Sequence, residues 1–348
     1  MNTAVGIFGA SGYSGIELSR ILSRHPGVRL SFVTSDRWAG RTVRSMIPDV
    51  DLPLTYVSPS DVATLAGQCE VALLATPADV SLKLGEQLLS LGRKVIDLSG
   101  AFRLDDPAAF ERSYGMASSG SQKEAVYALP EFSREGIADA KLVSNPGCYP
   151  TAAALGLAPL LRAGLLDPSS LIIDAASGVT GAGRKATEAF SFTEIAGDFR
   201  AYRVLKHQHT PEITQVLGRA AGEAVKVVFT PHLLPLKRGI LSTAYARLRA
   251  DRKATSEELR EELVAAYRDE PFVQVAAGPD EVSLHQVVGT NLCRIGVAAE
   301  PEAGGQVVVI SAIDNLVKGA AGQAVQNLNL ILGLPETTGL QGLRAFHP

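Results

Sequence analysis

Apolar stretches of strand length alternate with segments of helical periodicity over the first 147 residues. Strands are expected at 5–8, 28–33, 71–75, 94–98 and 141–144, with helices at 16–23 and 81–91. Apolar strands separated by helix-length segments are typical of a parallel sheet that helices cover on both faces. We therefore expect an α/β domain of this kind over residues 1–147.

The pattern changes after residue 147, because strands now often follow one another without a helix between them. Strands are expected at 171–175, 225–230, 241–248, 294–299 and 307–313, with helices at 150–162, 257–267 and 320–332. Consecutive strands favour a mixed or antiparallel sheet. We predict a second, α+β domain over residues 148–315, and we expect a C-terminal helix at 316–335 to complete the first domain.

The composition is typical of a globular protein, and the numbers of basic and acidic side chains are nearly equal. Of the 348 residues, 46% are hydrophobic, and 33 basic against 36 acidic side chains give a net charge of −3. No Lys/Arg tract indicates nucleic-acid binding. No apolar run approaches the ~18 residues that span a bilayer, and a strand pattern already begins at Thr3, where a secretory signal would lie. We therefore expect a cytoplasmic protein that binds neither nucleic acid nor membrane.

The three cysteines, Cys69, Cys148 and Cys293, are isolated from one another. They form neither a C-x-x-C pair nor a metal-ligand spacing, so no metal site is predicted from them. An odd number at wide spacing argues against a secreted disulfide framework and suits a reducing compartment. Cys69 and Cys293 lie in apolar, strand-like segments, where a free cysteine is usually a small core residue.

A glycine-rich turn joins the first strand to the first helix. Its glycines have the spacing of a dinucleotide-binding loop: one permits the tight turn, one lets backbone N–H groups approach a pyrophosphate, and one lets helix and strand pack closely. The helix N-terminus would face the phosphates with its positive dipole end. The loop therefore predicts a Rossmann domain. We assign the cofactor site to the loop residues Gly9, Ser11, Gly12, Tyr13, Ser14 and Gly15.

The end of the second strand bears on which dinucleotide binds. An acidic side chain near this point usually holds the ribose hydroxyls of NAD, whereas Arg or Ser accommodates the 2′-phosphate of NADP. Asp36 lies here, but Ser35 and Arg37 flank it. Because Arg37 can pair with a phosphate through two hydrogen bonds, we favour NADP over NAD.

Cys148 lies where a predicted strand meets a predicted helix, in the segment Ser144–Thr151 (SNPGCYPT). A thiol at a helix start has its pKa lowered by the helix dipole and by nearby N–H groups. The thiolate is the nucleophile that acyl transfer needs, and the same N–H groups could hold the oxyanion of a tetrahedral intermediate. We predict that Cys148 is a catalytic nucleophile.

His207 and His209 are two residues apart, so in an extended segment both rings face the same side. Thr210 is expected to cap the helix that Pro211 starts. Imidazole is suited to proton transfer near neutral pH, so the pair could deprotonate the cysteine and later protonate a hemithioacetal oxygen. We expect Glu212 to orient one ring.

Of the two histidines, His207 is expected to be the base, because a protonated His209 ring would be disfavoured at a helix start. A metal site is the alternative for the pair, but no clear third ligand accompanies it. The other histidines lack such a context and are expected to be structural or exposed: His25, His232, His285 and His347.

Fixed cations would be needed to hold carboxylate or phosphate groups of a substrate. Arg103 follows the strand that ends near Ser99, and Arg184 and Lys185 follow the glycine-rich segment 177–183. That segment is similar to an anion-binding nest of backbone N–H groups. These residues are the candidates for anion binding.

Taken together, the motifs resemble those of the N-acetyl-gamma-glutamyl-phosphate reductase family, which serves arginine biosynthesis. The resemblance covers nearly the whole chain, to about Leu332. It rests on the segments 9–15, 145–151, 177–185, 207–213, 229–233, 238–241 and 313–319. Two departures from the family pattern are Ser99-Gly-Ala-Phe-Arg103 for Ser-Ala-Asp-Phe-Arg, and Tyr127-Ala-Leu-Pro-Glu131 for Tyr-Gly-Leu-Pro-Glu.

The resemblance implies a Rossmann NADP domain and a second domain shared in plan with aspartate-semialdehyde and glyceraldehyde-phosphate dehydrogenases. It places the nucleophile at Cys148 and the base at His207 or His209. The substrate-binding residues that it implies are Arg103, Asn145, Ser177, Arg184 and Glu212. It extends the cofactor site beyond the glycine loop to Ser35, Arg37, Thr76, Pro77, Ser99, Gly178, Gly181 and Asn315.

The expected function is NADPH-dependent reduction of a small acyl phosphate, N-acetylglutamyl 5-phosphate, to the semialdehyde through a Cys148 thioester. A homodimer or homotetramer is expected. Three alternatives remain open: a reductase of a carrier-protein-bound aminoadipyl or glutamyl phosphate, an enzyme like aspartate-semialdehyde dehydrogenase, and a non-catalytic NADP-sensing regulator. The regulator would not require Cys148 or the histidine pair.

Overall fold

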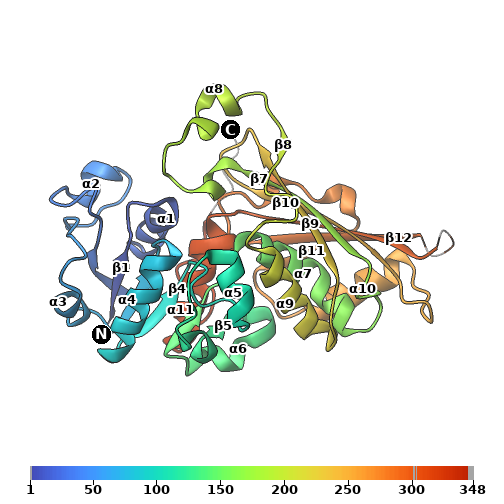
Figure 1. Cartoon of the computed structure of the whole chain (residues 1–348), viewed down its shortest axis with the longest axis horizontal. Helices are drawn as coiled ribbons and strands as arrows, with labels where there is room; N and C mark the ends of the chain where they lie inside the picture. Colours follow the sequence, from blue (N-terminus) through green and yellow to red (C-terminus); the bar gives the residue numbers. More distant parts are fainter. Residues whose placement is uncertain (1, 301, 303, 344–348) are drawn as a thin grey trace. The chain divides into compact units, whose positions relative to one another are not determined.

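The chain folds into two compact units, each built around its own sheet (Figure 1). The computed structural model describes residues 2–343 except 301 and 303, so His347 lies outside the described residues. Within the described part, one unit comprises residues 2–147 and 320–342, and the other comprises residues 148–319 with 343. No helix in the described ranges is long and apolar enough to cross a membrane.

The sheet of the first unit has six strands in the order β2-β1-β3-β4-β6-β5, and all neighbouring pairs are parallel. The strands are β1 (Thr3–Phe8), β2 (Val28–Val33), β3 (Val71–Leu74), β4 (Lys94–Asp97), β5 (Val126–Tyr127) and β6 (Leu142–Ser144). The predicted parallel sheet is thereby confirmed. The two-residue β5 was not predicted.

Helices of the first unit pack in two groups. The C-terminal α11 contacts α1, α6 and β4, whereas α4 contacts α3, β3 and β4. Their bounds are α1 (Tyr13–Leu22), α2 (Val43–Met46), α3 (Val62–Ala66), α4 (Ala78–Ser90), α5 (Pro107–Tyr114), η1 (Ser121–Glu124), α6 (Pro130–Ala138) and α11 (Gly322–Ile331). The connections of β1, β3 and β4 to their following helices lie at the carboxyl ends of these strands, where ligands bind in open α/β sheets.

The sheet of the second unit has seven strands in the order β11-β12-β13-β10-β7-β9-β8. The strands are β7 (Leu171–Gly178), β8 (Arg200–Ala201), β9 (Val227–Leu234), β10 (Ile240–Arg247), β11 (Val273–Val275), β12 (Cys293–Glu300) and β13 (Gln306–Ile313). The β7–β9 and β11–β12 pairs are parallel, and the other pairs are antiparallel. The prediction of a mixed sheet is confirmed.

Helix α7 (Cys148–Arg162) is the central helix of the second unit, and every residue from Tyr149 to Leu161 is buried. It contacts α9 (Thr210–Ala221), α10 (Ser256–Ala266) and the strands β10, β12 and β13. A helix that is apolar on all sides is typical of such a buried position. A π-helical turn, η6 (Val317–Ala321), leads from the last strand toward α11.

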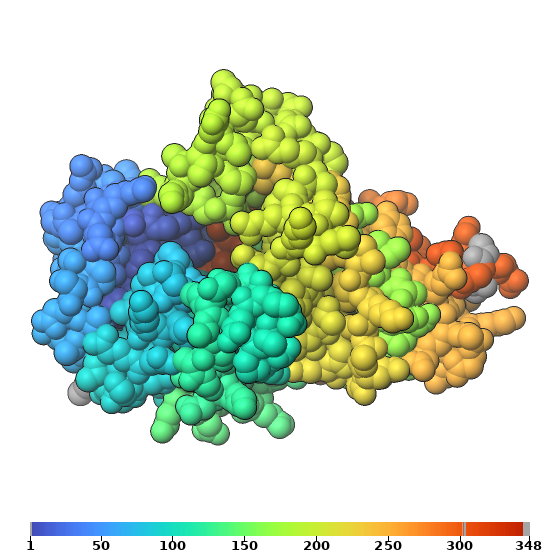
Figure 2. Space-filling view, viewed as in Figure 1, coloured from blue at the N-terminus to red at the C-terminus, as the bar shows by residue number. Residues whose placement is uncertain are grey.

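Between β7 and α9 the chain makes a long exposed excursion, which Figure 2 shows as a yellow-green protrusion. It contains the short elements η2 (Val179–Ala182), η3 (Glu188–Phe190), α8 (Phe192–Ile195) and β8. Two further short helices, η4 (Pro279–Glu281) and η5 (Leu284–Gln286), precede β12. None of these short segments was predicted, because each is too brief to show a periodic pattern.

Candidate active site

The glycines of the loop between β1 and α1 differ in what the fold requires of them. Gly9 has a φ of +81°, and a Cβ there would lie 2.5 Å from the carbonyl oxygen of Ala75. A Cβ at Gly15 would lie 2.5 Å from the Gly9 oxygen. At Gly12 the nearest atom would be 3.6 Å away, an ordinary contact. The fold therefore requires glycine at positions 9 and 15. It does not require glycine at position 12, where the absence of a side chain allows a ligand to approach the backbone.

A cavity of about 330 Å³ lies beside this loop. The predicted cofactor residues that line it are Gly9, Ser11, Gly12, Ser35, Arg37, Thr76 and Pro77. Tyr13, Ser14 and Gly15 are not in the lining but begin α1, which carries no acidic residue in its first turn. A helix N-terminus without acidic side chains, next to a bare glycine backbone, fits a dinucleotide pyrophosphate.

The residues after β2 have specific contacts in this cavity. Ser35 donates its hydroxyl to Ser11 Oγ at 2.8 Å and accepts the backbone N–H of Trp38. Asp36 accepts a hydrogen bond from Ser58, whereas Arg37 is exposed and lines the cavity. The guanidinium is accessible to a phosphate, and the preference for NADP stays a prediction.

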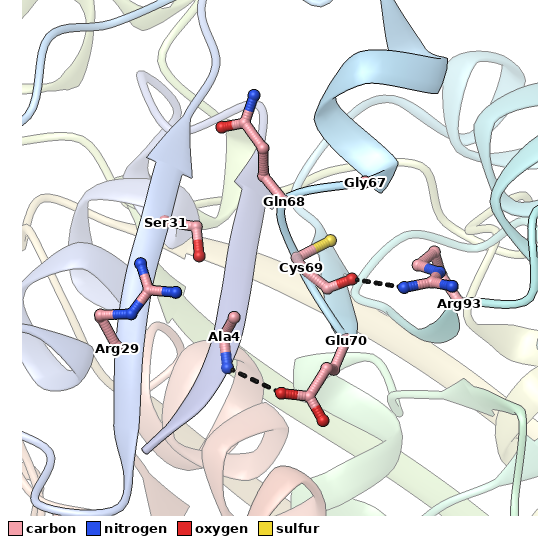
Figure 3. Close-up of a pocket in the computed structure, with 8 residues that line it drawn as sticks. All are labelled: Ala4, Arg29, Ser31, Gly67, Gln68, Cys69, Glu70 and Arg93. Atoms are coloured by element: carbon pink, nitrogen blue, oxygen red, sulfur yellow. Dashed lines mark hydrogen bonds between the residues drawn. The ribbon is translucent and has the colours of Figure 1, made fainter. Parts of the chain in front are cut away.

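A second cavity, of about 390 Å³, lies at the amino ends of the parallel strands (Figure 3). Glu70 accepts the backbone N–H of Ala4, and Arg93 donates to the carbonyl oxygen of Cys69. These bonds tie the starts of β1, β3 and β4 together. Since dinucleotides bind at the carboxyl ends of such strands, this cavity is not the cofactor site.

Arg103 and Asn145 lie in a buried polar network at the carboxyl ends of β4 and β6. Arg103 is 6% exposed, and it donates from Nε to the Asn145 carbonyl at 2.8 Å and from Nη2 to the Leu98 carbonyl at 2.7 Å. The Asn145 side chain donates to Ala320 O and accepts from Asn327. These contacts hold the main chain that leads into Cys148. The substrate-binding roles of Arg103 and Asn145 stay predictions.

Asp97, which the sequence reasoning did not single out, is a fully buried carboxylate at the end of β4. Burial raises its pKa, while hydrogen bonds, first that of Ser99, act against that rise. Ser99 donates to Asp97 Oδ2 at 2.7 Å and accepts the N–H of Ala101. An acidic residue at the end of an apolar strand is the sequence feature from which this buried carboxylate could have been predicted. The structure shows that Ser99, a predicted cofactor residue, is held by this carboxylate.

Cys148 is the first residue of α7, as predicted, and it is partly exposed. A Cβ at Gly319, in the π-helical turn η6, would lie only 2.7 Å from the Cys148 Cβ. Cys69 and Cys293 are buried, and burial raises the pKa of Cys69 to about 11. The environment of Cys148 thus differs from that of the two core cysteines.

The histidine pair is brought together by a turn and not by an extended segment, so that prediction is wrong. Arg203 and Leu205 have positive φ angles of 46° and 57°, and they bend the chain just before His207. The two imidazole centroids are nevertheless 4.9 Å apart. The prediction that Thr210 caps α9 is also wrong: Thr210 is its first residue and His209 is the preceding cap position.

A cluster of aromatic rings, not predicted from the sequence, surrounds the histidines. The Tyr149 ring, directly after Cys148, lies 5.5 Å from His207 and 5.9 Å from His209. Its hydroxyl lies 2.9 Å from that of Tyr202. Burial is the main cause that raises the pKa of Tyr202 to about 12, and the charge of Cys148 adds to it. The hydroxyl pair is therefore protonated and close enough to Cys148 to respond to its charge.

The predicted anion nest after β7 takes a different form. Gly178 lies against another backbone segment, since a Cβ there would be 2.7 Å from Arg238 N, and Gly181 belongs to the exposed η2. Asn315 accepts the Gly239 N–H at 2.8 Å and donates to Thr180 at 3.0 Å, which anchors this loop. The ligand roles of these residues stay predictions.

The remaining predicted substrate residues differ in exposure. Ser177 and Glu212 are buried, whereas Arg184 is exposed on the excursion. Ser177 donates to the Gly178 carbonyl at 3.0 Å, and its side chain also bonds to Tyr149. Ser177 therefore belongs to the same polar cluster as Tyr149. Over the described ranges no group of three or more His, Cys, Asp or Glu side chains could hold a metal ion.

Known protein families match both units. Residues 4–140 match the family described as semialdehyde dehydrogenase, NAD binding domain, and residues 148–315 match semialdehyde dehydrogenase, dimerisation domain. Among solved structures, the chain is similar to aspartate semialdehyde dehydrogenase II from Vibrio cholerae, with a TM-score of 0.74 at 20% identity over 96% of this chain and 99% of that one. At that identity the likeness shows the fold alone.

Curated relatives are far more similar in sequence. N-acetyl-gamma-glutamyl-phosphate reductase of Laribacter hongkongensis is 48% identical over 97% of both chains. The protein of the same name from Pelotomaculum thermopropionicum is 47% identical over 98% of this chain and 99% of its own. The resemblance inferred from the motifs is confirmed, and this chain belongs to the N-acetyl-gamma-glutamyl-phosphate reductase family.

Proposed function

We propose that the protein reduces N-acetyl-L-glutamyl 5-phosphate to N-acetyl-L-glutamate 5-semialdehyde and phosphate, with NADPH, as a step of arginine biosynthesis. The observation that carries this proposal is the position of Cys148, a partly exposed thiol at the start of a buried helix with two histidines packed on the next residue, Tyr149. Relatives with this name, one of them 48% identical, support the choice of substrate.

Residues 1–147, completed by the C-terminal segment that contains α11 (Gly322–Ile331), form the NADP-binding domain in this proposal; the helix is shorter than the expected 316–335. Residues 148–315 form the catalytic and oligomerisation domain. Gly12 would hold the dinucleotide through its backbone, and Ser35 and Arg37 would bind a 2′-phosphate. Ser11, Thr76, Pro77 and Ser99 are assigned to it as well, and the family motifs also imply Gly178, Gly181 and Asn315. When bound, the reduced nicotinamide supplies a hydride.

Cys148 performs the covalent step. Its thiolate, favoured by the N-terminal end of α7, attacks the acyl carbon, forms a C–S bond and expels phosphate. The cofactor, when bound, would supply the hydride that reduces this thioester, and the Cys148 adduct would then carry an oxygen anion. The C–S bond then breaks, the C=O bond forms again and the thiolate returns. His207 and His209 assist by hydrogen bonding or proton transfer at the sulfur and the oxygen.

Substrate binding is assigned to the polar residues that the family motifs imply: Arg103, Asn145, Ser177, Arg184 and Glu212. Asn145, Ser177 and Glu212 are buried, so in this proposal they act mainly by positioning their neighbours. Arg184 is exposed and can pair with the substrate carboxylate. Arg103 is assigned to the phosphate end, although its described contacts are to main-chain carbonyls.

Oligomerisation is assigned to one face of the second sheet, and the match to a dimerisation domain supports this. Val228, Ile172 and Tyr245 are paired across β9, β7 and β10, and they are 46%, 45% and 43% exposed. A row of exposed apolar side chains on one face of a sheet is suited to association. A second copy of the chain covers this row in a homodimer, or in a homotetramer, in the cytoplasm. Light scattering after size exclusion would measure the number of copies.

The direct test is a steady-state assay in the oxidative direction. N-acetylglutamate 5-semialdehyde, phosphate and NADP should give NADPH, with NAD a poorer acceptor. Aspartate semialdehyde in the same assay is the matched control and should be a much poorer substrate. Preference for aspartate semialdehyde, or no turnover with either aldehyde, would contradict the proposal.

A further inference from the structure

Asp314 is a fully buried carboxylate that directly follows β13 in the second unit. Its Oδ1 accepts the backbone N–H groups of Leu316 at 2.7 Å and Val317 at 3.1 Å. Its Oδ2 accepts the Gly289 N–H at 2.7 Å and lies 3.5 Å from Arg238 Nη1. Burial of a carboxylate is costly unless hydrogen bonds and a counter-charge compensate it, and both are present here. The side chain therefore joins the start of η6 to the loops that carry Gly289 and Arg238.

The main chain of Asp314 holds the same turn at a second point. Gly319 donates its N–H to Asp314 O at 2.9 Å, which is the i→i+5 pattern of a π-helix. Turns of this kind are rare and frequently lie at functional sites. The oxygens of one residue thus fix both the chain that enters η6 and the middle of η6.

The next residue, Asn315, is fixed in a similar way. It is 2% exposed, accepts the Gly239 N–H at 2.8 Å and donates to Thr180 Oγ1 at 3.0 Å. Together with the contacts of Asp314, these bonds attach the chain before η6 to residues 180, 238–239 and 289. The position of the turn is therefore set by tertiary contacts and not by its own sequence alone.

Gly319 of this turn lies directly against the proposed nucleophile. A Cβ at Gly319 would be 2.7 Å from Cys148 Cβ and 3.2 Å from Cys148 Cα. The φ angle of Gly319 is outside the left-handed region, so its backbone conformation would accept a side chain. Glycine is therefore required by the close approach to Cys148. A displacement of η6 would remove this packing contact from the cysteine.

We propose that Asp314 is a positioning residue for Cys148: it holds η6 in place, keeps Gly319 packed on the cysteine and so fixes the sulfur at the start of α7. The inference rests on the proposed function for the role of Cys148 as nucleophile. A helix end stabilises a thiolate, and this effect falls off within the first turn. A displaced sulfur is therefore less ionised and less well aligned for attack. Asp314 acts through the turn and needs no contact with the substrate.

Alkylation of Cys148 by iodoacetamide tests the inference without a substrate. The rate at pH 7, followed by mass spectrometry of the peptide that contains Cys148, should fall about tenfold in Asp314→Ala. Asp314→Asn keeps an oxygen acceptor for the N–H groups of Leu316 and Val317, so its rate should stay within about threefold of the wild-type rate. An unchanged rate in Asp314→Ala, or equal losses in the two variants, would overturn the proposal.

Ser311→Ala is the matched control for loss of a buried hydrogen bond in the same unit. Ser311 is 2% exposed, lies on β13 and donates to Ala152 O of α7 at 2.8 Å. The variant should lose stability, yet its rate of Cys148 alkylation should stay within about twofold of the wild-type rate. A loss as large as that in Asp314→Ala would make the effect one of general destabilisation and would overturn the proposal.

Gly319→Ala tests the contact itself and decides the case in which Asp314→Ala does not fold. Its methyl group would meet Cys148 Cβ at 2.7 Å, so the cysteine or the turn must move. Alkylation and kcat should each fall at least ~tenfold, while KM and NADPH affinity stay unchanged. The control is Gly156→Ala, which places a methyl group of α7 at 3.2 Å from Val309 Cγ1 and should leave both rates within about threefold.

Wild-type alkylation in Gly319→Ala, or a rise in KM with kcat unchanged, would overturn the proposal. Failure of the proposed function would instead appear as absent turnover in the wild-type protein, whereas the alkylation results need no turnover. The two failures are therefore distinguishable.

Discussion

The cofactor loop and the histidine turn are both short, motif-bearing segments, yet they reach their geometry in different ways. At the loop, positions 9, 12 and 15 act within one strand–turn–helix unit, and two of the three glycines are required by backbone atoms nearby. At the turn, the ring of His207 accepts a hydrogen bond from the backbone N–H of His209 and packs against rings from α7 and β9. The first site is local in sequence, and the second depends on tertiary contacts.

This difference shows which kinds of chemistry a motif can specify alone. A bare backbone and a helix N-terminus follow from residue spacing, because the strand and helix that they join are adjacent in the chain. The protonation of an imidazole follows from what surrounds it. The geometry of the loop could therefore be predicted from the sequence, whereas the surroundings of the histidines could not.

Cys148→Ser should give the largest effect, because it removes the reactive atom on which the histidine site acts. Turnover should fall by at least ~10³, since a serine hydroxyl is far less ionised than a thiol at neutral pH. NADPH affinity, measured by fluorescence titration, should not change. Retention of more than about a tenth of the activity would contradict covalent catalysis at this residue.

Acid should weaken the second unit through His207. The pKa of its ring is about 4 in the folded protein against 6.5 for an ordinary histidine. The unfolded chain therefore gains a proton first, and stability is lost as pH falls from 6.5 to about 4. The difference corresponds to about 3 kcal/mol. Urea unfolding followed by circular dichroism should show that His207→Gln lacks this part of the acid loss; an unchanged pH dependence would contradict the buried neutral ring.

Gly15→Ala and Gly12→Ala should separate fold from binding at the cofactor loop. The substitution Gly15→Ala forces a methyl group to 2.5 Å from the Gly9 oxygen and should destabilise the protein by about 3 kcal/mol. The change at Gly12 meets no close atom, so stability should hold while NADPH affinity falls about tenfold. Thermal unfolding and nucleotide titration measure the two effects. Loss of stability in both variants would remove the distinction.

Arg37→Ala should have the smallest effect, because it removes only a contact to the 2′-phosphate of the nucleotide. Affinity for NADPH should fall by a free energy on the order of 1.5–3 kcal/mol, and affinity for NADH should change little. The control is Arg41→Ala, an exposed arginine on the same segment that does not line the cavity. Equal weakening of both nucleotides would remove Arg37 from the 2′-phosphate site.

The sequence was sufficient for the larger elements of the fold. Every predicted strand and long helix is present, because each has an apolar pattern longer than a few residues. Short helices such as α5 and α6 escaped prediction, although Asp106 and Pro107 are a recognisable helix start. Two turns of helix show too little periodicity to distinguish them from a loop.

The active site was predicted only in part, for reasons that particular residues make clear. The position of Cys148 at a helix start was predicted from its turn-forming neighbours and is confirmed, whereas its catalytic role stays a prediction. Tyr202 was missed because it meets Tyr149 across 53 positions of sequence. The turn before His207 was missed because Arg203 and Leu205 adopt positive φ angles that residues with side chains rarely take.

The central claim, a thioester on Cys148, is tested most directly by trapping it. Incubation with N-acetylglutamate 5-semialdehyde and NADP, without phosphate, followed by acid quench and peptide mass spectrometry, should show one N-acetylglutamyl group on the peptide that contains Cys148. One equivalent of NADPH should form in the same burst, and Cys148→Ser should show neither. A burst of NADPH without acylated peptide, or acylation at another residue, would contradict the account.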